Sequence, residues 1–195
     1  MKSYILVFLF LMSHLYSVAI SKKEAQFKQT VSAVIQAFSN QDSVAINQLI
    51  DKKTGVYLLY REGVFDNYTH LSQIAFHDES FPQVMFSYAK GIPSSSLRYA
   101  KLPTYQCEPG QWNKKGLFVD TTKTSHLLSS ICKSRNKLVP DNIEPKSIAA
   151  YYQLEGLSRR VVLSVNELEL VFYVSYIKGK WYLTIVDHVT SDCSA

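Results

Sequence analysis

The last third of the chain constrains the fold most, because it holds three consecutive runs rich in β-branched and aromatic residues. These runs span Arg160–Val165, Leu168–Ile177 and Lys180–Val189. Short polar connections separate them, Asn166-Glu167 in the first gap and Lys178-Gly179 in the second. Two-residue connections of this kind are typical of tight hairpin turns. The pattern therefore predicts an antiparallel meander.

Side-chain alternation assigns two faces to this meander, since successive side chains of a strand point to opposite sides. One face is apolar and carries Leu168, Leu170, Phe172, Val174, Trp181, Leu183 and Ile185. The other face carries Glu169, Ser175, Tyr182 and Thr184. We expect the apolar face to be buried against another element.

An amphipathic helix near the start of the chain can supply that cover. Ser21 and Glu24 form a capping box, and the apolar residues that follow at helical spacing are Phe27, Val31, Val34, Ile35 and Phe38. A shorter helix capped by Asp42 or Ser43 and a strand over Val56–Tyr60 come next. The sequence predicts an α+β fold with N-terminal helices packed on one face of a curved antiparallel sheet.

The middle of the chain is interrupted by glycine, proline and a run of serines. We expect a short helix near Thr69–Phe76, an extended segment over Leu97–Tyr105 and a helix over Lys123–Lys133. The stretch Pro140–Pro145 has the composition of a connector within one domain. Residues 20–195 are therefore predicted to form a single domain.

Two segments carry a resemblance to a known family. FKQTVSAVIQAFSNQDSVAINQLIDKKTGVYLL, read as helix, short helix and strand, and the terminal GKWYLTIVD together resemble the NTF2-like (cystatin-like) superfamily. The resemblance implies a cone of curved sheet around a long helix. It implies no single function, because this superfamily hosts dehydratases, isomerases, ligand-binding modules and transport adaptors. The closing stretch from Trp181 to Cys193 also resembles exported Bacteroidetes-type proteins of unassigned function.

The first residues read as a secretory signal peptide. Lys2 gives a positive start, Tyr4–Met12 is an apolar run, and Ser17-Val18-Ala19 places small residues where signal peptidase reads them. Residues 1–19 are the predicted signal peptide, with cleavage after Ser21 as the alternative. Neither site carries a lipoprotein cysteine, so the mature protein is expected to be secreted or periplasmic and not held on a membrane.

The formal net charge of +5 comes from scattered basic pairs such as Lys52-Lys53, Lys114-Lys115 and Arg159-Arg160, with acidic residues among them. A nucleic-acid surface would need basic residues gathered on one face. The charge pattern therefore favours an ordinary solvated surface, and no nucleic-acid partner is expected.

The three cysteines have different neighbourhoods. Cys107 and Cys193 lie in polar, turn-like surroundings, whereas Cys132 follows Leu128 and Ile131 on the apolar side of an expected helix. In an oxidising compartment this predicts a Cys107–Cys193 disulfide and a buried, unpaired Cys132. A Cys107–Cys132 bridge is the alternative.

Asp187 is the acidic residue that the strand pattern places most unusually. It has the same strand parity as Trp181, so a regular strand would point its carboxylate to the apolar side, and Tyr176 on the neighbouring strand would face it. Asp187, Tyr176 and Trp181 are therefore candidate ligand-binding residues. The alternative is that the strand ends or bulges there and Asp187 caps a turn or meets an arginine.

No catalytic or metal-binding motif supports a sharper prediction. His70, His77, Asp78 and Glu79 are the densest group of metal-ligand types, but their spacing matches no zinc motif. The serine and lysine of Ser130–Lys133 match SxxK without its partner motifs. We therefore assign no catalytic residue, no metal site and no cofactor.

The sequence predicts an exported module that binds a small apolar or sugar-like ligand or a protein partner. The alternative is an enzyme that uses a pocket acid such as Asp187 for proton transfer or dehydration. The oligomeric state is left open, with a dimer as one option.

Overall fold

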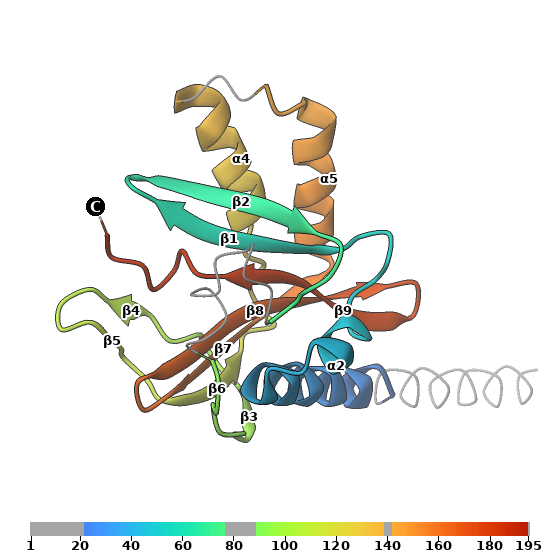
Figure 1. Cartoon of the computed structure of the whole chain (residues 1–195), viewed down its shortest axis with the longest axis vertical. Helices are drawn as coiled ribbons and strands as arrows, with labels where there is room; N and C mark the ends of the chain where they lie inside the picture. The colour runs from blue at the N-terminus through green and yellow to red at the C-terminus, as the bar shows by residue number, and fades with distance from the viewer. Residues whose placement is uncertain (1–21, 77–88, 139–141, 195) are drawn as a thin grey trace, which may run out of the picture.

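The computed structural model describes residues 22–76, 89–138 and 142–194. The predicted signal peptide, Ser21 of the expected capping box, and His77, Asp78 and Glu79 of the candidate metal group lie outside the described residues. Within them, the chain has mixed α and β structure (Figure 1). Among these residues, no helix has the length and apolar character that a bilayer crossing requires.

The described elements begin with a helix over residues 22–40. The others are α2 (Ser43–Asn47), β1 (Val56–Glu62), β2 (Phe65–Leu71), β3 (Leu97–Tyr99), β4 (Tyr105–Gln106), β5 (Gln111–Trp112), β6 (Gly116–Val119), α4 (Leu127–Leu138), α5 (Pro145–Gly156), β7 (Ser158–Val165), β8 (Leu168–Ile177) and β9 (Lys180–Asp187).

The C-terminal meander is confirmed: β7 pairs antiparallel with β8, and β8 pairs antiparallel with β9. Lys178 and Gly179 both have positive φ, as a tight two-residue hairpin turn requires. The first helix and α2 also lie where the sequence predicts them, and Asp42 caps α2 by accepting from the backbone N–H groups of Val44 and Ala45.

The prediction for the segment after β1 is wrong. Residues 65–71 form strand β2 rather than the start of a helix, and β2 folds back on β1 over seven paired residues. Gly63, whose φ is 61°, makes the reversal possible. The structure also has a helix that was not predicted, α5, which begins at Pro145, the last residue of the expected connector.

The main sheet has seven strands in the order β2-β1-β9-β8-β7-β6-β3. It is mixed, because β1 runs parallel to β9 and β3 runs parallel to β6. The prediction of a wholly antiparallel sheet is therefore wrong. This prediction failed for a physical reason. Local alternation can indicate a hairpin between neighbouring strands, but it cannot indicate the pairing of β1 with β9, which are far apart in the sequence.

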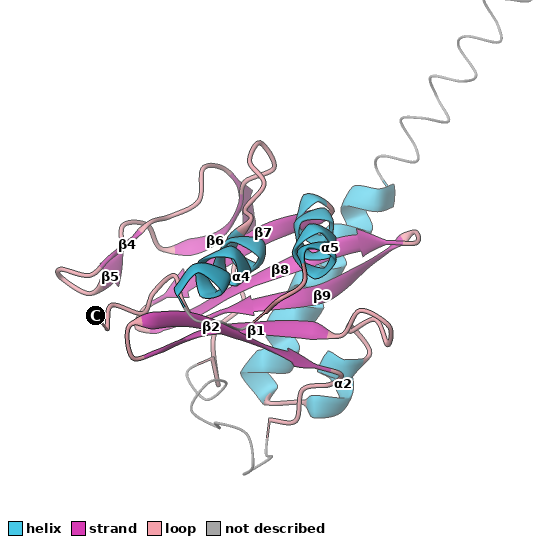
Figure 2. Ribbon diagram, turned by 90° about the horizontal axis from the view of Figure 1, so that it is seen from above, coloured by secondary structure: helices cyan, strands magenta, loops and turns pink. Residues whose placement is uncertain are grey.

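Helices lie over both faces of this sheet (Figures 1 and 2). On one face Phe27 and Phe38 of the first helix share an apolar core with Leu163, Phe172 and further sheet residues. On the other face Leu128 and Ile131 of α4 pack with residues such as Tyr173 and Ile185. The sheet is thus the middle of three layers. An NTF2-like cone stays a prediction.

A β-bulge in β9 changes which side chains face which layer. Tyr173 pairs with Ile185 but Val174 pairs with Leu183, so Thr184 is an extra residue on β9. Leu183 therefore packs in the core under the first helix, while Ile185 packs under α4. The prediction that Ile185 shares the face of Trp181 and Leu183 is wrong, since strict alternation assumes a regular strand.

A buried carboxylate joins α4 to α5. Glu155 of α5 is fully buried, and its two oxygens accept hydrogen bonds from the backbone N–H groups of Leu128 and Ser129 and from the Ser129 hydroxyl at 2.7, 3.2 and 2.6 Å. These donors are at the first turn of α4, which otherwise lacks partners for them. Burial raises the pKa of Glu155 above its ordinary value of 4.5, although these hydrogen bonds oppose the rise.

The raised pKa of Glu155 predicts a pH-dependent stability. The folded protein holds a proton on this carboxyl more tightly than the unfolded chain does, so the stabilising contribution is full below pH 4.5. It is lost as the pH rises through the folded pKa. The free energy of unfolding of the native protein, measured relative to Glu155→Gln by urea denaturation, should therefore fall from pH 4.5 towards neutral.

Glu144→Gln is the matched control for this experiment. Glu144 precedes α5 and is exposed, with only an exposed Lys146 ammonium 2.7 Å away. Its difference curve should be nearly flat, because exposed ion pairs contribute little. If instead the free energy of unfolding of the unsubstituted protein relative to Glu155→Gln grew with pH, the hydrogen bonds from the α4 N–H groups would affect the Glu155 pKa more than burial does.

Candidate functional site

Tyr176 and Trp181, two of the predicted ligand-binding residues, do lie together. They are directly paired across β8 and β9, with ring centroids 5.0 Å apart. Trp181 is buried, and its indole N–H donates to the backbone oxygen of Lys23 at 3.0 Å. The Lys23 ammonium lies 4.0 Å from the centre of the Tyr176 ring. This pair therefore fastens the start of the first helix to the sheet.

Asp187 lies on the other face of the sheet, so it does not meet Tyr176 as predicted. The bulge at Thr184 reverses its orientation. Its carboxylate accepts from the backbone N–H groups of Val189 and Thr190 at 3.0 Å each, from the Thr190 hydroxyl at 2.7 Å and from Arg160 at 2.8 Å. The alternative arrangement, a turn cap with an arginine partner, is the one observed.

The candidate metal ligands within the described residues do not assemble. His70 makes a hydrogen bond between Nε2 and the Thr54 carbonyl at 2.9 Å. Elsewhere, the His126 ring stacks on Tyr152 with centroids 3.9 Å apart. In the part of the chain that the structure describes, no three histidine, cysteine or acidic side chains gather as a metal site would need.

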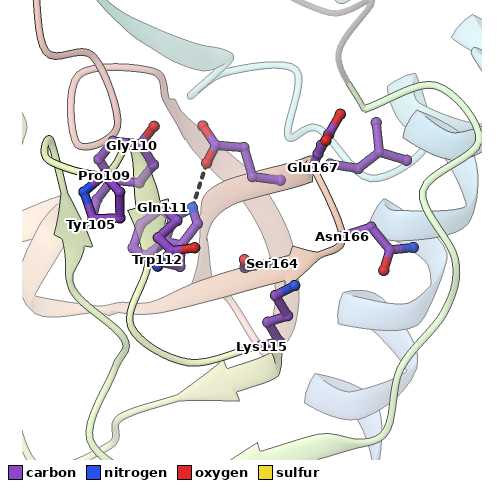
Figure 3. Close-up of a pocket in the computed structure, with 11 residues that line it drawn as sticks. Tyr105, Pro109, Gly110, Gln111, Trp112, Lys115, Ser164, Asn166 and Glu167 are labelled. Atoms are coloured by element: carbon purple, nitrogen blue, oxygen red, sulfur yellow. Dashed lines mark hydrogen bonds between the residues drawn. The ribbon is translucent and has the colours of Figure 1, made fainter.

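A pocket of about 590 Å³ lies between the β4–β5 hairpin and the turn from β7 to β8 (Figure 3). Its lining combines aromatic, amide, hydroxyl and charged groups. The lining residues are Tyr105, Pro109, Gly110, Gln111, Trp112, Lys115, Ser164, Asn166, Glu167, Leu168 and Glu169. We call it the Trp112 pocket. Its volume falls in the range of small-molecule sites.

The hairpin that forms one wall of the Trp112 pocket is too short to be stable alone. Each of its strands has two residues, and the pairs are Tyr105 with Trp112 and Gln106 with Gln111. Its anchor is the Trp112 ring, which is 7% exposed and packs on Val162 and Val171 of the main sheet. The wall therefore depends on tertiary contacts.

Glu169 fixes the position of that anchor. One of its carboxylate oxygens accepts from the Trp112 indole N–H, and the other accepts from the Ser191 hydroxyl. A dashed line from the Trp112 nitrogen marks the first of these bonds in Figure 3. Because both oxygens have donors, Glu169 acts as a positioning residue for the wall.

The predicted Cys107–Cys193 disulfide is confirmed, with Cα atoms 5.6 Å apart. It ties the hairpin to the C-terminal segment, which lies beside it (Figure 1). Arg61 of β1 holds that segment in turn, donating to the backbone oxygens of Asp192 and Ser194 at 2.7 and 3.1 Å. The alternative Cys107–Cys132 bridge is wrong.

Cys132 is free and buried on α4, as predicted. Burial raises the pKa of its thiol to about 11, so it is un-ionised at neutral pH. A thiol in this state is a poor nucleophile, and it cannot readily exchange with the exposed disulfide.

The lining of the Trp112 pocket has one basic and two acidic side chains. Lys115 and Glu167 are both exposed, and Glu169 accepts hydrogen bonds from two neutral donors. Between them lie the neutral side chains of Gln111, Ser164 and Asn166. The lining offers hydrogen-bonding groups and aromatic surface.

Sequence reasoning missed this pocket. It placed an extended segment at Leu97–Tyr105 but did not recognise the hairpin that follows. The available signal was Tyr105 and Trp112 on either side of Pro109-Gly110, where Gly110 has a φ of 80°. The opposite wall, residues 164–169, comes from a distant part of the sequence.

Comparisons of the chain with protein-family models, with curated proteins and with solved structures found no match.

Removing the disulfide should loosen the β4–β5 hairpin and leave the main sheet in place. A Cys107→Ser/Cys193→Ser variant should keep the main sheet, but amides of residues 105–112 should lose protection in hydrogen exchange. Loss of the cross-link, which spans 86 residues, should lower the free energy of unfolding by at most about 4–5 kcal/mol. The unsubstituted protein, denatured without a reducing agent, should show one free thiol, and the Cys132→Ala variant should show none.

Two results would contradict this account of the disulfide. One is three free thiols in the denatured, unreduced protein. The other is unchanged protection of residues 105–112 in the double variant, which would mean that Trp112 alone holds the wall.

Proposed function

We propose that this protein is an exported binding module that holds a small polar ligand in the Trp112 pocket. The observation that carries the proposal is the construction of the pocket wall. A two-residue-per-strand hairpin is held by a disulfide, a buried tryptophan and a doubly bonded carboxylate. Such reinforcement favours a preformed site, and preformed sites lose less entropy on binding.

Export is supported by two independent features. The sequence predicts a cleaved signal peptide over residues 1–19, and disulfides such as Cys107–Cys193 persist mainly in oxidising compartments. We therefore place the mature protein outside the cytoplasm, secreted or periplasmic. No nucleic-acid partner is proposed.

An NTF2-like arrangement is part of the proposal. It is supported by a long amphipathic first helix that shares a core with the sheet. That core includes large rings, among them Phe27, Phe38, Phe172 and Trp181. Because apolar side chains occupy the space between the helix and the sheet, we propose that the ligand binds at the Trp112 pocket and not there.

Binding explains the geometry better than catalysis does. The acid that the sequence suggested for an enzyme was, for example, Asp187, and four donors surround its carboxylate. A general base needs a lone pair that can reach the substrate. In the Trp112 pocket, each oxygen of Glu169 accepts one hydrogen bond, from Trp112 or from Ser191, and these bonds hold its carboxylate against the pocket wall.

The proposal predicts that a ligand found by screening depends on the pocket wall. A thermal-shift screen of small polar metabolites against the oxidised protein should give hits that shift the melting temperature. Tyr105→Ala should weaken their binding by about tenfold or more, since truncating a central contact typically costs 1–2 kcal/mol or more. Dissociation constants from calorimetry provide the measurement.

Tyr152→Ala is the matched control, because Tyr152 is an exposed tyrosine on α5 that does not line the pocket. Its ligand affinity should equal that of the native protein. Hits that bind Tyr105→Ala and the native protein equally would place the ligand elsewhere and contradict the proposal.

A further inference from the structure

The charged groups of the Trp112 pocket limit the ligand that it can hold. Three of its lining residues are charged, Lys115, Glu167 and Glu169. Glu169 accepts from Trp112 and Ser191, which are neutral donors, so the lining still has one basic and two acidic side chains, and Lys115 and Glu167 are exposed. An anionic ligand would lose hydration on entering and would meet more acidic than basic groups. Phosphorylated compounds are therefore poor matches, and a polyamine would leave most of its several charges without a partner in the pocket.

The uncharged polar lining argues equally against a lipid. Gln111, Ser164 and Asn166 bring amide and hydroxyl groups to the pocket. An acyl chain would remove water from these groups and return no hydrogen bonds, which opposes its binding. The ligand that fits must carry its own donors and acceptors on several sides.

An apolar surface is nevertheless present beside these polar groups. Tyr105 is partly exposed, and its ring meets Trp112 edge-on with centroids 5.4 Å apart. In Figure 3 the two aromatic residues lie on the hairpin side, while Asn166 and Glu167 lie on the opposite side. The ligand would thus contact a ring and the Gln111 amide on the hairpin side, and Asn166 and Glu167 on the other.

We infer that the ligand of the Trp112 pocket is a neutral oligosaccharide. This inference rests on the proposed function and names the ligand class of the same site. A pyranose ring has an apolar face of C–H groups and a rim of hydroxyls, which matches an aromatic surface bordered by amides. The volume of about 590 Å³ suits a ligand of two or three sugar rings.

A free amino acid is the nearest competitor, since Lys115 and Glu167 could receive its carboxylate and ammonium. Both side chains are exposed, so their interactions with a ligand would be screened by water and salt. The two classes therefore differ in salt dependence and in their response to neutralising these residues.

The inference is tested with the oxidised mature chain and a panel of defined probes. The neutral probes are trisaccharides of glucose, mannose and N-acetylglucosamine. The comparison probes are a trigalacturonate, free amino acids and a fatty acid. Calorimetry at low and high salt, with saturation-transfer NMR, should show binding of at least one neutral trisaccharide. Its affinity should be unchanged by salt.

Substitutions in the pocket sharpen the test. Tyr105→Ala and Gln111→Ala should each weaken trisaccharide binding by about tenfold. Gln111 is an exposed residue, so its truncation should leave the fold intact even if Tyr105→Ala disturbs the hairpin. Lys115→Gln and Glu167→Gln should change affinity by less than about threefold. Tyr152→Ala is again the matched control.

The outcomes separate the inference from the proposed function. Absence of binding by every neutral trisaccharide overturns the inference, as does preferential binding of the charged probes with loss in Lys115→Gln or Glu167→Gln. If a charged probe binds instead and its affinity falls in Tyr105→Ala and in Gln111→Ala, the proposed function stands. If trisaccharide binding is insensitive to both pocket substitutions, the proposed function and the inference fail together.

Discussion

Burial of β8 and β9 from both sides is the constraint on which the rest of the structure depends. Every residue from 170 to 175 of β8 is buried, so neither face of this strand can be left to water. A strand covered on both faces becomes a continuous apolar run instead of an alternating one. The first helix covers one side and α4 with α5 covers the other. The layers therefore follow from the central strands.

The sequence revealed what is encoded locally. The meander, the first helix, α2 and the settings of Cys107, Cys132 and Cys193 each depend on neighbouring residues, and all were predictable. The parallel pairing of β1 with β9 joins residues more than a hundred positions apart. The expected helix near Thr69–Phe76 likewise failed, because residues 65–71 pair along β1 and this pairing outweighs local propensity.

Asp187 shows how one irregular residue limits inference about a site. Alternation along β9 is correct up to Leu183, and then Thr184 adds a residue that β8 does not match. From there every side chain changes face, so the predicted meeting of Asp187 with Tyr176 does not occur. The alternative prediction, in which Asp187 caps a turn, did not depend on regular alternation. In the structure its carboxylate accepts from the backbone N–H and the hydroxyl of Thr190.

The Trp112 pocket was out of reach for a related reason. Its walls come from residues 105–115 and 164–169, and neither segment contains a motif. What unites them is Glu169, on the face of β8 opposite Leu170, which reaches both the hairpin through Trp112 and the C-terminal segment through Ser191. The disulfide joins the same two segments a second time. These links lie outside the apolar core between the first helix and the sheet, and Leu168 is the lining residue that also packs against that core.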